Sequence, residues 1–497
     1  MSTLQRESPL RLGAAALATA LVACAVGPNF HRPSPPAAAG YGSAPSQGTT
    51  AAAPGTGGAA QAFVAGMDIP GQWWTLFRSD KLTAMVEQSL KGNPNITAAQ
   101  AALREAHELY KAQRTSFFPV VQGGFDALRA KNAVDTIANP TSLPQVNPYY
   151  NLYTAQLNLS YMPDVFGGTR RSLEATRAQV EATRFQLIAT YVTLSSNVVT
   201  TAVQEAALRG QIAATERLLE LQHQLTETVK GQKALGTASD VDLLPQLAAE
   251  AQTAATLPPL QKQLGQTRDA LTALLGRLPS EEPADTFRLE DLTLPSELPV
   301  SLPSRLVEQR PDVRQAEENM HAASAQVGVT VADMLPQFTI SATTGSTALE
   351  ISKLFTAYTG FWDVGASLTQ TLFDAGAMFY RHSAAAAALD QAGAEYRATV
   401  LLACQNVADT LRALQADADA LTATAEADRA ARASFDLARQ QQQLGTLSVV
   451  ALLNAEQTYQ QAEIALVQAQ ANRYADTAGL FQALGGGWWN LPGATFK

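Results

Sequence analysis

Two stretches of the chain run for 69 residues without a proline, and their length constrains the fold more than any other feature. They extend from Gly167 to Leu235 and from Gly376 to Leu444. Apolar residues recur along both with the alternating three- and four-residue spacing of a coiled-coil seam. At about 1.5 Å per residue such a helix is about 100 Å long, which exceeds any compact globular domain. The predicted seam positions are Leu187, Tyr191, Leu194 and Val198, then Val407, Leu411, Leu414, Ala418, Leu421 and Ala425.

The two long stretches belong to an internal duplication. The pattern Leu-Gly-Thr-x-Ser follows each of them, beginning at Leu235 and at Leu444, an offset of 209 residues. Upstream, Pro94 and Pro311 each open an alanine-rich helical run that meets another proline 25 residues later. The same offset of 209 relates Gly167 to Gly376 and Leu275-Gly276 to Leu484-Gly485. We therefore predict two repeats, residues 80–278 and 303–486, joined by a linker at 279–302.

Each Leu-Gly-Thr sequence predicts a turn between two antiparallel helices. A glycine with positive φ suits the end of a helix, and Ser239 or Ser448 suits the N-cap of the helix that returns. The returning helix of the first copy should span about 240–275, and the short helix that opens the repeat could continue its line. Pro258-Pro259 fall inside this returning helix and predict a break or kink there, whereas the second copy has no proline at the matching positions.

The N-terminus resembles a bacterial lipoprotein signal. Arginines precede an alanine-rich apolar run that ends in Leu21-Val22-Ala23-Cys24. We predict that residues 1–23 are removed and that Cys24 becomes an acylated N-terminus; the alternative is a plain secretory signal in which Cys24 is incidental. Acyl chains anchor firmly, because each buried methylene contributes about 0.8 kcal/mol. The small and proline-rich residues within 24–62 predict a flexible tether with nothing to bury.

Four shorter segments alternate apolar and polar residues, as β-strands do. They form two predicted hairpins, at about 120–163 and about 337–373, and the pattern is poorest at 120–130. The alternation alone also fits soluble hairpins, but runs of about 10 residues with aromatic ends and a nearby lipid anchor favour a membrane barrel. Four strands leave two bare edges in lipid. The chain must therefore oligomerise: two chains would give eight strands around packed side chains and three would give twelve around a water-filled lumen, so a duct favours three copies.

The composition excludes several classes of function. The 497 residues include 35 Lys and Arg against 44 Asp and Glu, so the net charge of −9 leaves no basic field for nucleic acid. Two cysteines, Cys24 and Cys404, cannot form a disulfide framework, and the five scattered histidines lack zinc spacing. Phosphate loops, nucleophile elbows and paired His-Glu motifs are absent from the sequence. We therefore expect no enzyme, no cofactor and no metal site.

Together these residues resemble a known family. Cys24 to Pro33, Trp73-Trp74 and Asn93-Pro94, followed by the repeats and turns, are similar to lipid-anchored outer-membrane efflux factors of the TolC/OprM (NodT) type. The resemblance implies a mainly α two-repeat chain with membrane β. Its long antiparallel coiled-coil helices would form a periplasmic α-barrel, and its four strands would contribute to a trimeric 12-stranded outer-membrane β-barrel. Residues 63–92 would form an N-terminal equatorial segment and 487–497 a C-terminal tail.

The function that this resemblance implies is the exit duct of a tripartite efflux system, which passively conducts drugs or toxic compounds out of the cell. The protein would be a palmitate-bearing lipoprotein of the cell outer membrane that extends into the periplasm. Its partners would be two further copies of the chain, outer-membrane lipid, a periplasmic adaptor (membrane fusion) protein and an inner-membrane pump of the RND type. The alternatives are a duct for type I protein secretion, a periplasmic adaptor, and a coiled-coil lipoprotein that tethers the envelope.

The resemblance places the functional site at the two tip turns, 235–240 and 444–449, where the duct would constrict. Asp242 matches an acidic aperture position of the family, and Asp240 and Asn454 are further aperture candidates. Asp240 and Asp242 could instead only favour the dipole at a helix start. Ala451 stands at the position equivalent to Asp242, so a charged latch would be weaker or built differently. The adaptor would dock at Leu235, Gly236, Thr237, Ser239, Leu444, Gly445, Thr446 and Ser448.

Overall fold

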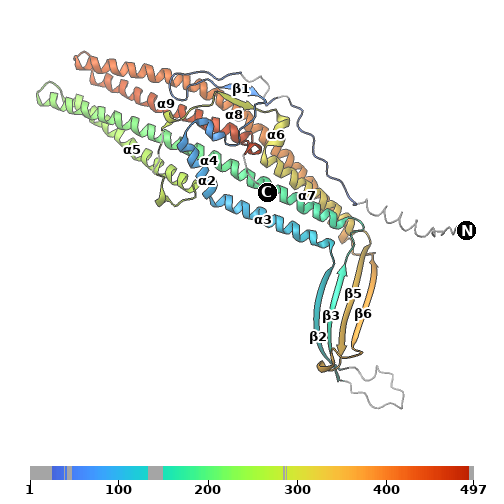
Figure 1. Cartoon of the computed structure of the whole chain (residues 1–497). Coiled ribbons are helices and arrows are strands. Elements are labelled where there is room, and N and C mark those ends of the chain that lie inside the picture. Colours follow the sequence, from blue (N-terminus) through green and yellow to red (C-terminus); the bar gives the residue numbers. More distant parts are fainter. Residues whose placement is uncertain are drawn as a thin grey trace, which may run out of the picture. The chain divides into compact units, whose positions relative to one another are not determined.

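The structure is a computed structural model that describes residues 25–38, 40–41, 48–131, 149–283, 286 and 288–491. Figure 1 shows its helices and strands, and the chain forms two compact units. The first unit comprises residues 1–32, 105–181 and 318–394, and the second comprises residues 33–104, 182–317 and 395–497. Among the described residues, no helix combines the length and the apolar character that crossing a membrane requires.

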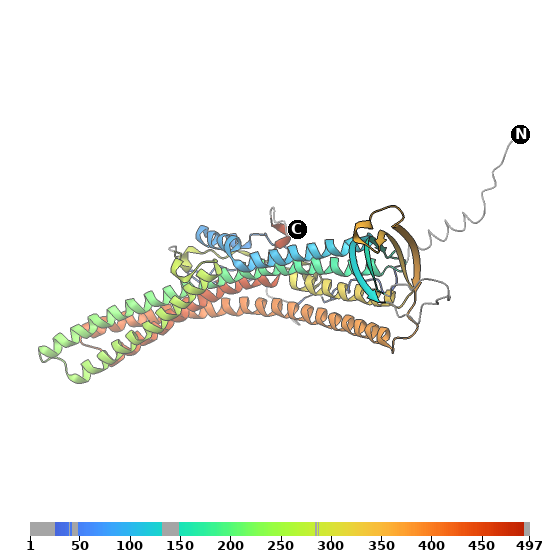
Figure 2. The same ribbon diagram turned by 90° about the horizontal axis from the view of Figure 1, so that it is seen from below.

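Two helices of equal length dominate the chain. Helix α4 (Gly168–Ala234) and helix α8 (Ala377–Gln443) each have 67 residues, which confirms the predicted long helices. Each is followed by a returning helix of 35 residues, α5 (Asp240–Leu274) and α9 (Val449–Ala483). The predicted seam residues are buried, apart from the partly buried Tyr191. In both views the tips of the α4–α5 and α8–α9 hairpins lie at the same end of the second unit (Figure 1 and Figure 2).

Shorter helices open each repeat and meet the end of the returning helix. In the first repeat, α2 (Asp80–Gly92) and α3 (Pro94–Arg114) flank Asn93, whose side-chain amide donates to the carbonyl of Leu274 at 2.9 Å. In the second, α6 (Pro303–Gln309) and α7 (Pro311–Asp333) flank Arg310, whose guanidinium donates to the carbonyl of Ala483 at 3.0 Å. Leu274 and Ala483 are 209 residues apart, so the two repeats fasten equivalent helix ends with different side chains.

The four predicted strands form one antiparallel sheet. They are β2 (Val120–Lys131), β3 (Tyr149–Tyr161), β5 (Gln337–Ala348) and β6 (Gly360–Thr369), in the order β2-β3-β5-β6. The register aligns one apolar row across the sheet, Val121, Leu159, Ala342 and Val364. The next row is polar and lies on the opposite face: Gln122, Asn158, Thr343 and Asp363. The sheet thus has one apolar and one polar face, as the alternation predicted.

The second unit has an aromatic core, whose packing was not predicted from the sequence. The 3-10 helix η1 (Trp73–Phe77) buries its two tryptophans, and Trp73 stacks on Phe481 with ring centroids 5.3 Å apart. A small parallel sheet pairs β1 (Ala62–Ala65) with β4 (Glu297–Val300), and the sequence analysis did not predict it. It joins the segment before the first repeat to the linker between the repeats.

The predicted break in the first returning helix is wrong. Helix α5 runs from Asp240 to Leu274 with Pro245, Pro258 and Pro259 inside it. Pro258 and Pro259 lack an N–H, so the carbonyls of residues 254 and 255 lose their helical partners. Both prolines and Ala255 are exposed, and water can therefore satisfy these acceptors. A kink of the helix axis stays a prediction.

The expectation of an empty tether is also wrong for residues 48–62. Thr50 and Gln61 are buried. The buried guanidinium of Arg473 on α9 donates to the carbonyl of Ala59 at 3.0 Å and contacts the Thr50 hydroxyl at 3.4 Å. The composition was misleading because the contacts involve backbone carbonyls and a hydroxyl, which small residues supply as well as large ones.

Candidate functional site

The first helical tip ends α4 with a glycine in a left-handed conformation. Gly236 has a φ of 78°, and the N–H of Thr237 donates to the carbonyl of Gln232 at 2.9 Å. This six-to-one bond closes the helix and turns the chain. Ser239 then begins α5, and its N–H donates to a carboxylate oxygen of Asp242 at 2.9 Å. The Thr237 hydroxyl also donates to the carbonyl of Gln232, so this polar side chain forms its hydrogen bond within the turn.

The second tip repeats this geometry. Gly445 has a φ of 72°, and the N–H and hydroxyl of Thr446 both donate to the carbonyl of Gln441 at 3.0 Å. Ser448 begins α9, and its hydroxyl accepts from the N–H of Ala451 at 3.3 Å. The Leu-Gly-Thr-x-Ser pattern therefore builds the same turn twice.

The acidic residues are confined to the first tip. Asp242 accepts from both the N–H and the hydroxyl of Ser239, and these bonds lower its carboxyl pKa. Asp240 forms an ion pair with Lys233. Asn454 is exposed on α9, in the other hairpin, where its carbonyl accepts from the Thr458 hydroxyl. Asp240 and Asp242 thus cap and brace a helix start, and Asn454 contacts neither of them through a described hydrogen bond.

Apolar side chains project from both tips into solvent. Leu235 is 82% exposed and Leu444 is 78% exposed at equivalent positions of the two turns. Val241 on α5 and Val450 on α9 are exposed beside them. A pair of exposed apolar tips is typical of a surface that a partner covers.

Behind the tips the hairpins share an apolar layer. Phe435 of α8 stacks on Tyr459 of α9 with centroids 5.7 Å apart, and Leu447 packs against the same cluster. Leu447, inside the second tip turn, is thus half-buried in this layer. The remaining members of the cluster are Leu221, Leu225, Ala438, Leu452 and Ala455.

The sequence analysis missed a titratable group next to this layer. Glu456 of α9 is fully buried, and neither carboxylate oxygen has a well-formed hydrogen bond among the described residues. Burial raises the pKa of Glu456 to about 7, although Gln222 of α4 and Arg439 of α8 lower it. The sequence contained a signal for the burial of Glu456: it lies four residues after Leu452, so both side chains lie on the same buried face of α9.

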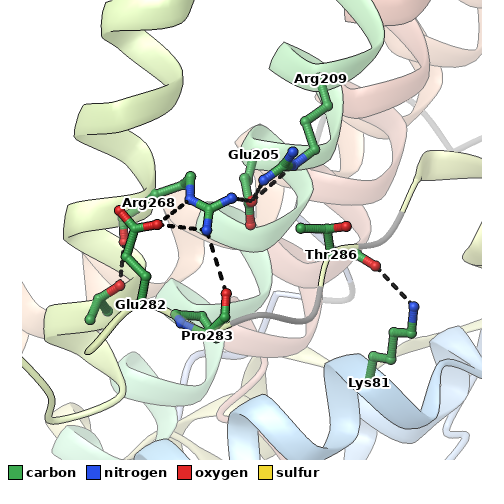
Figure 3. Close-up of polar contacts among 8 residues, drawn as sticks. Lys81, Glu205, Arg209, Arg268, Glu282, Pro283 and Thr286 are labelled. Atoms are coloured by element: carbon green, nitrogen blue, oxygen red, sulfur yellow. Dashed lines mark hydrogen bonds and ion pairs between the residues drawn. The ribbon is translucent and has the colours of Figure 1, made fainter. Parts of the chain in front are cut away.

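An ion network fastens the linker between the repeats to the helices (Figure 3). Glu205 of α4 is almost fully buried and lies 2.8 Å from the guanidinium of Arg209 and 3.6 Å from that of Arg268. Arg268 of α5 also donates to Glu282 of the linker at 2.9 Å. Lys81 of α2 donates to the backbone carbonyl of Thr286 at 2.9 Å. Arg268 of α5 and Lys81 of α2 therefore hold the linker directly, and Glu205 of α4 braces Arg268 (Figure 3).

The remaining sequence predictions concern the two cysteines and metal binding. Cys24, the predicted acylation site, lies outside the described residues. Cys404 is a half-buried free thiol whose pKa is raised by burial. Within the described ranges, no group of three or more His, Cys, Asp or Glu side chains could hold a metal ion.

Paired helical hairpins, two repeats and a shared four-stranded sheet define the TolC-like class of outer-membrane channels. The chain belongs to the outer membrane efflux protein family, whose family model matches residues 85–277 and 302–486. The protein is therefore an outer-membrane efflux channel and not an enzyme. These findings confirm the predicted family, fold class and type of function.

Relatives align along almost the whole chain. The pyoverdine export outer membrane protein OpmQ of Pseudomonas putida is 27% identical over 448 residues, which cover 90% of this chain and 94% of OpmQ. The toluene efflux pump outer membrane protein TtgF of Pseudomonas putida is 27% identical over 489 residues, 96% of each chain.

Solved structures agree with this assignment. The outer-membrane channel OprN has a TM-score of 0.82 and 29% identity, over 94% of this chain and 100% of OprN. The Campylobacter jejuni CmeC outer membrane channel has a TM-score of 0.82 at 20% identity, over 93% of this chain and 95% of CmeC. The second likeness concerns the fold alone.

Proposed function

We propose that three copies of the chain assemble into the exit duct of a tripartite efflux system. The observation that carries this proposal is the open four-stranded sheet, in which β2 and β6 each pair on one side only among the residues that the structure describes. A bare edge cannot persist in lipid, because no water is present to satisfy its backbone groups. Pairing β6 of one copy with β2 of the next satisfies every edge, and three copies supply twelve strands.

The polar face of the sheet supports an open lumen. Where the apolar face meets lipid, the opposite face lines the interior, and its residues include Gln122, Asn158, Thr343 and Asp363. Eight strands would fill their interior with these side chains, whereas twelve leave room for water. A water-filled duct suits the passage of solutes.

We propose further that the duct conducts drugs or other toxic compounds delivered by an inner-membrane pump of the RND type through a periplasmic adaptor. OpmQ is named for pyoverdine export and TtgF for toluene efflux, and both names favour small molecules over secreted polypeptides. Cys24 would be acylated and would anchor the chain to the outer membrane. Since the pump supplies the energy, the duct itself is passive.

The adaptor would dock on the exposed tips. Leu235 and Leu444 give each hairpin an apolar end that a partner can cover, within the turns formed by Gly236 and Gly445. Replacing both leucines by aspartate should abolish cross-linking to the adaptor while the trimer persists in detergent. The matched control is Leu278→Asp, at the end of the first repeat, where the leucine is 66% exposed. Equal cross-linking in all three proteins would refute docking at the tips.

The decisive experiment on the whole proposal measures mass and conductance together. We expect the protein purified from outer membranes to have three times the mass of one chain in detergent and to form ion-conducting pores in planar bilayers. A monomer without conductance would overturn the duct, and an eight-stranded dimer with low conductance would overturn the trimer.

A further inference from the structure

The first described residues of the chain lie in a binding site built by the start of α4 and the middle of α7. The N–H of Val26 donates to the carbonyl of Phe166 at 3.0 Å. The guanidinium of Arg171 donates to the carbonyl of Val26 at 3.1 Å and to the side-chain oxygen of Asn29 at 2.7 Å. A third, longer bond reaches the carbonyl of Gly27 at 3.3 Å. One arginine therefore donates to three acceptors within residues 26–29.

Arg171 is held in place from its other side. Its side chain is almost fully buried and pairs with Glu174 one turn along α4 at 2.8 Å. Glu174 in turn contacts the ring of His321 on α7 at 3.0 Å. Phe30 stacks on that ring with centroids 4.3 Å apart and planes 15° apart. The peptide is thus clamped at Val26 by an arginine and at Phe30 by an aromatic stack.

Three glycines make room for this peptide. Gly27 has a φ of 89°, and a Cβ there would lie 2.4 Å from the Cα of Gly328 on α7. Gly167 has a φ of 82°, and a Cβ there would lie 2.5 Å from the Cα of Ala25. A Cβ on Gly328 would lie 2.9 Å from the Arg171 side chain. Backbone meets backbone here, which a surface segment resting by chance on a helix does not require.

We propose that residues 26–30, with Arg171, Glu174, His321 and Gly328, form an anchor lock that guides the sheet of the same chain into the outer membrane. The lock rests on the proposed acylation of Cys24, which is one peptide bond from Ala25. Because Phe166 and α4 directly follow β3, the lock seats the acylated end beside the root of the sheet within the first unit.

The lock would raise the effective concentration of the lipid anchor near the sheet. Without the lock, an acyl group on a free coil from residue 25 to 48 would wander about 26 Å from its attachment point. A locked Ala25 leaves one virtual bond of about 3.8 Å. Confinement to the smaller volume raises the local concentration of lipid anchor at the sheet by about a hundredfold or more. Membrane capture of the anchor and insertion of the strands thereby become one event.

The test compares lock variants in two backgrounds. Asn29→Ala removes one bond, Arg171→Ala removes three, and Gly27→Val introduces a backbone clash; Arg177→Ala changes an exposed arginine on the same helix and is the matched control. Each is made with Cys24 and with Cys24→Ser, and the full-length protein is pulse-labelled in cells. The readout is the rate at which heat-dissociable trimers appear in the outer membrane. Cleavage by chymotrypsin after Phe30 reports whether the lock is open.

With Cys24, we expect Arg171→Ala and Gly27→Val to slow assembly by about tenfold, Asn29→Ala by about threefold, and Arg177→Ala not at all. With Cys24→Ser, assembly should already be slow and the lock variants should add nothing, because anchor and lock act in one step. If the lock variants slow assembly equally in both backgrounds, these residues only stabilise packing, and the proposal is overturned. An unmodified Cys24 in the mass spectrum of the mature protein would also overturn it.

The proposed duct is judged separately. Trimers of the lock variants that do assemble should keep the mass and the conductance of the unaltered protein. If they assemble at the unaltered rate while chymotrypsin cleaves after Phe30, the lock has no part in assembly, and the duct stands without it.

Discussion

The buried carboxyl of Glu456 makes the stability of the folded chain depend on pH. Its pKa is raised from 4.5 to about 7, first of all by burial. Between these values the folded chain keeps a proton that the unfolded chain has lost. Stability therefore falls as the pH rises from about 4.5 to about 7, by about 3 kcal/mol in total, and stays low above that. Burial, together with the neighbouring Asp417, raises the pKa of Asp476 to about 7, and this group adds to the same trend.

Replacing Glu456 by glutamine should remove its share of this dependence. We expect Glu456→Gln to lose less stability between pH 5 and pH 8 than the unaltered protein does, because the amide stays neutral throughout. Thermal dissociation of detergent-solubilised trimers at the two pH values is the measurement. Glu216→Gln, on the exposed face of α4, is the control and should behave as the unaltered protein. A pH dependence that Glu456→Gln leaves intact would contradict the assignment.

Asp242 has two candidate roles that two substitutions separate. Asp242→Asn keeps an acceptor for the N–H of Ser239 but removes the charge, whereas Asp242→Ala removes both. If a ring of these carboxylates filters ions, both variants should lower the preference for cations by about twofold in single-channel recordings. If Asp242 only caps α5, selectivity should stay unchanged in both, and Asp242→Ala alone should speed amide exchange in the first turn of α5.

At the scale of elements, the two returning helices differ in their interior prolines. Helix α5 carries Pro258 and Pro259 where α9 carries Val467 and Gln468, yet both helices span 35 residues. An interior proline costs a helix about 3 kcal/mol. The exposure of both prolines limits this cost, but α5 should still open locally more often than α9.

Reciprocal substitutions test this difference. Pro258→Val restores an N–H to the carbonyl of residue 254, and we expect amides in 255–265 to exchange at least about tenfold more slowly. Val467→Pro should speed exchange in the matching stretch of α9 by a comparable factor. Hydrogen exchange followed by mass spectrometry resolves both segments. Unchanged exchange around residue 258 would mean that neighbouring contacts, not the prolines, set the local stability.

For the molecule as a whole, the two faces of the sheet determine where it can reside. Leu157 is 53% exposed on the apolar face, and its neighbour Gln156 lies on the polar face. An arginine on a lipid-facing position of a membrane strand costs about 2–4 kcal/mol near the bilayer centre. We expect Leu157→Arg to lower the yield of outer-membrane trimers strongly, while Gln156→Arg assembles normally and reduces cation conductance. Equal yields of the two variants would contradict the assignment of the faces.

Much of the fold follows from local sequence. The long helices are proline-free with a buried seam, and the strands alternate. Each tip turn depends on a glycine and on bonds between residues five positions apart, such as Thr237 to Gln232. Such features could be predicted because their causes lie within one helical turn or one strand. The duplication strengthens these predictions, because a weak pattern that recurs at a fixed offset seldom arises by chance.

The remaining features depend on residues far apart in the chain. Arg473 holds residues 48–62, Arg268 holds Glu282 and lies near Glu205, and Arg171 holds the peptide at Val26. In each case an arginine donates to backbone carbonyls or to a distant carboxylate, which no composition or periodicity records. The sequence by itself determined the helices, the turns, the strands and the family. Only the tertiary structure decided which charged side chains are buried, because burial depends on which distant surfaces pack together.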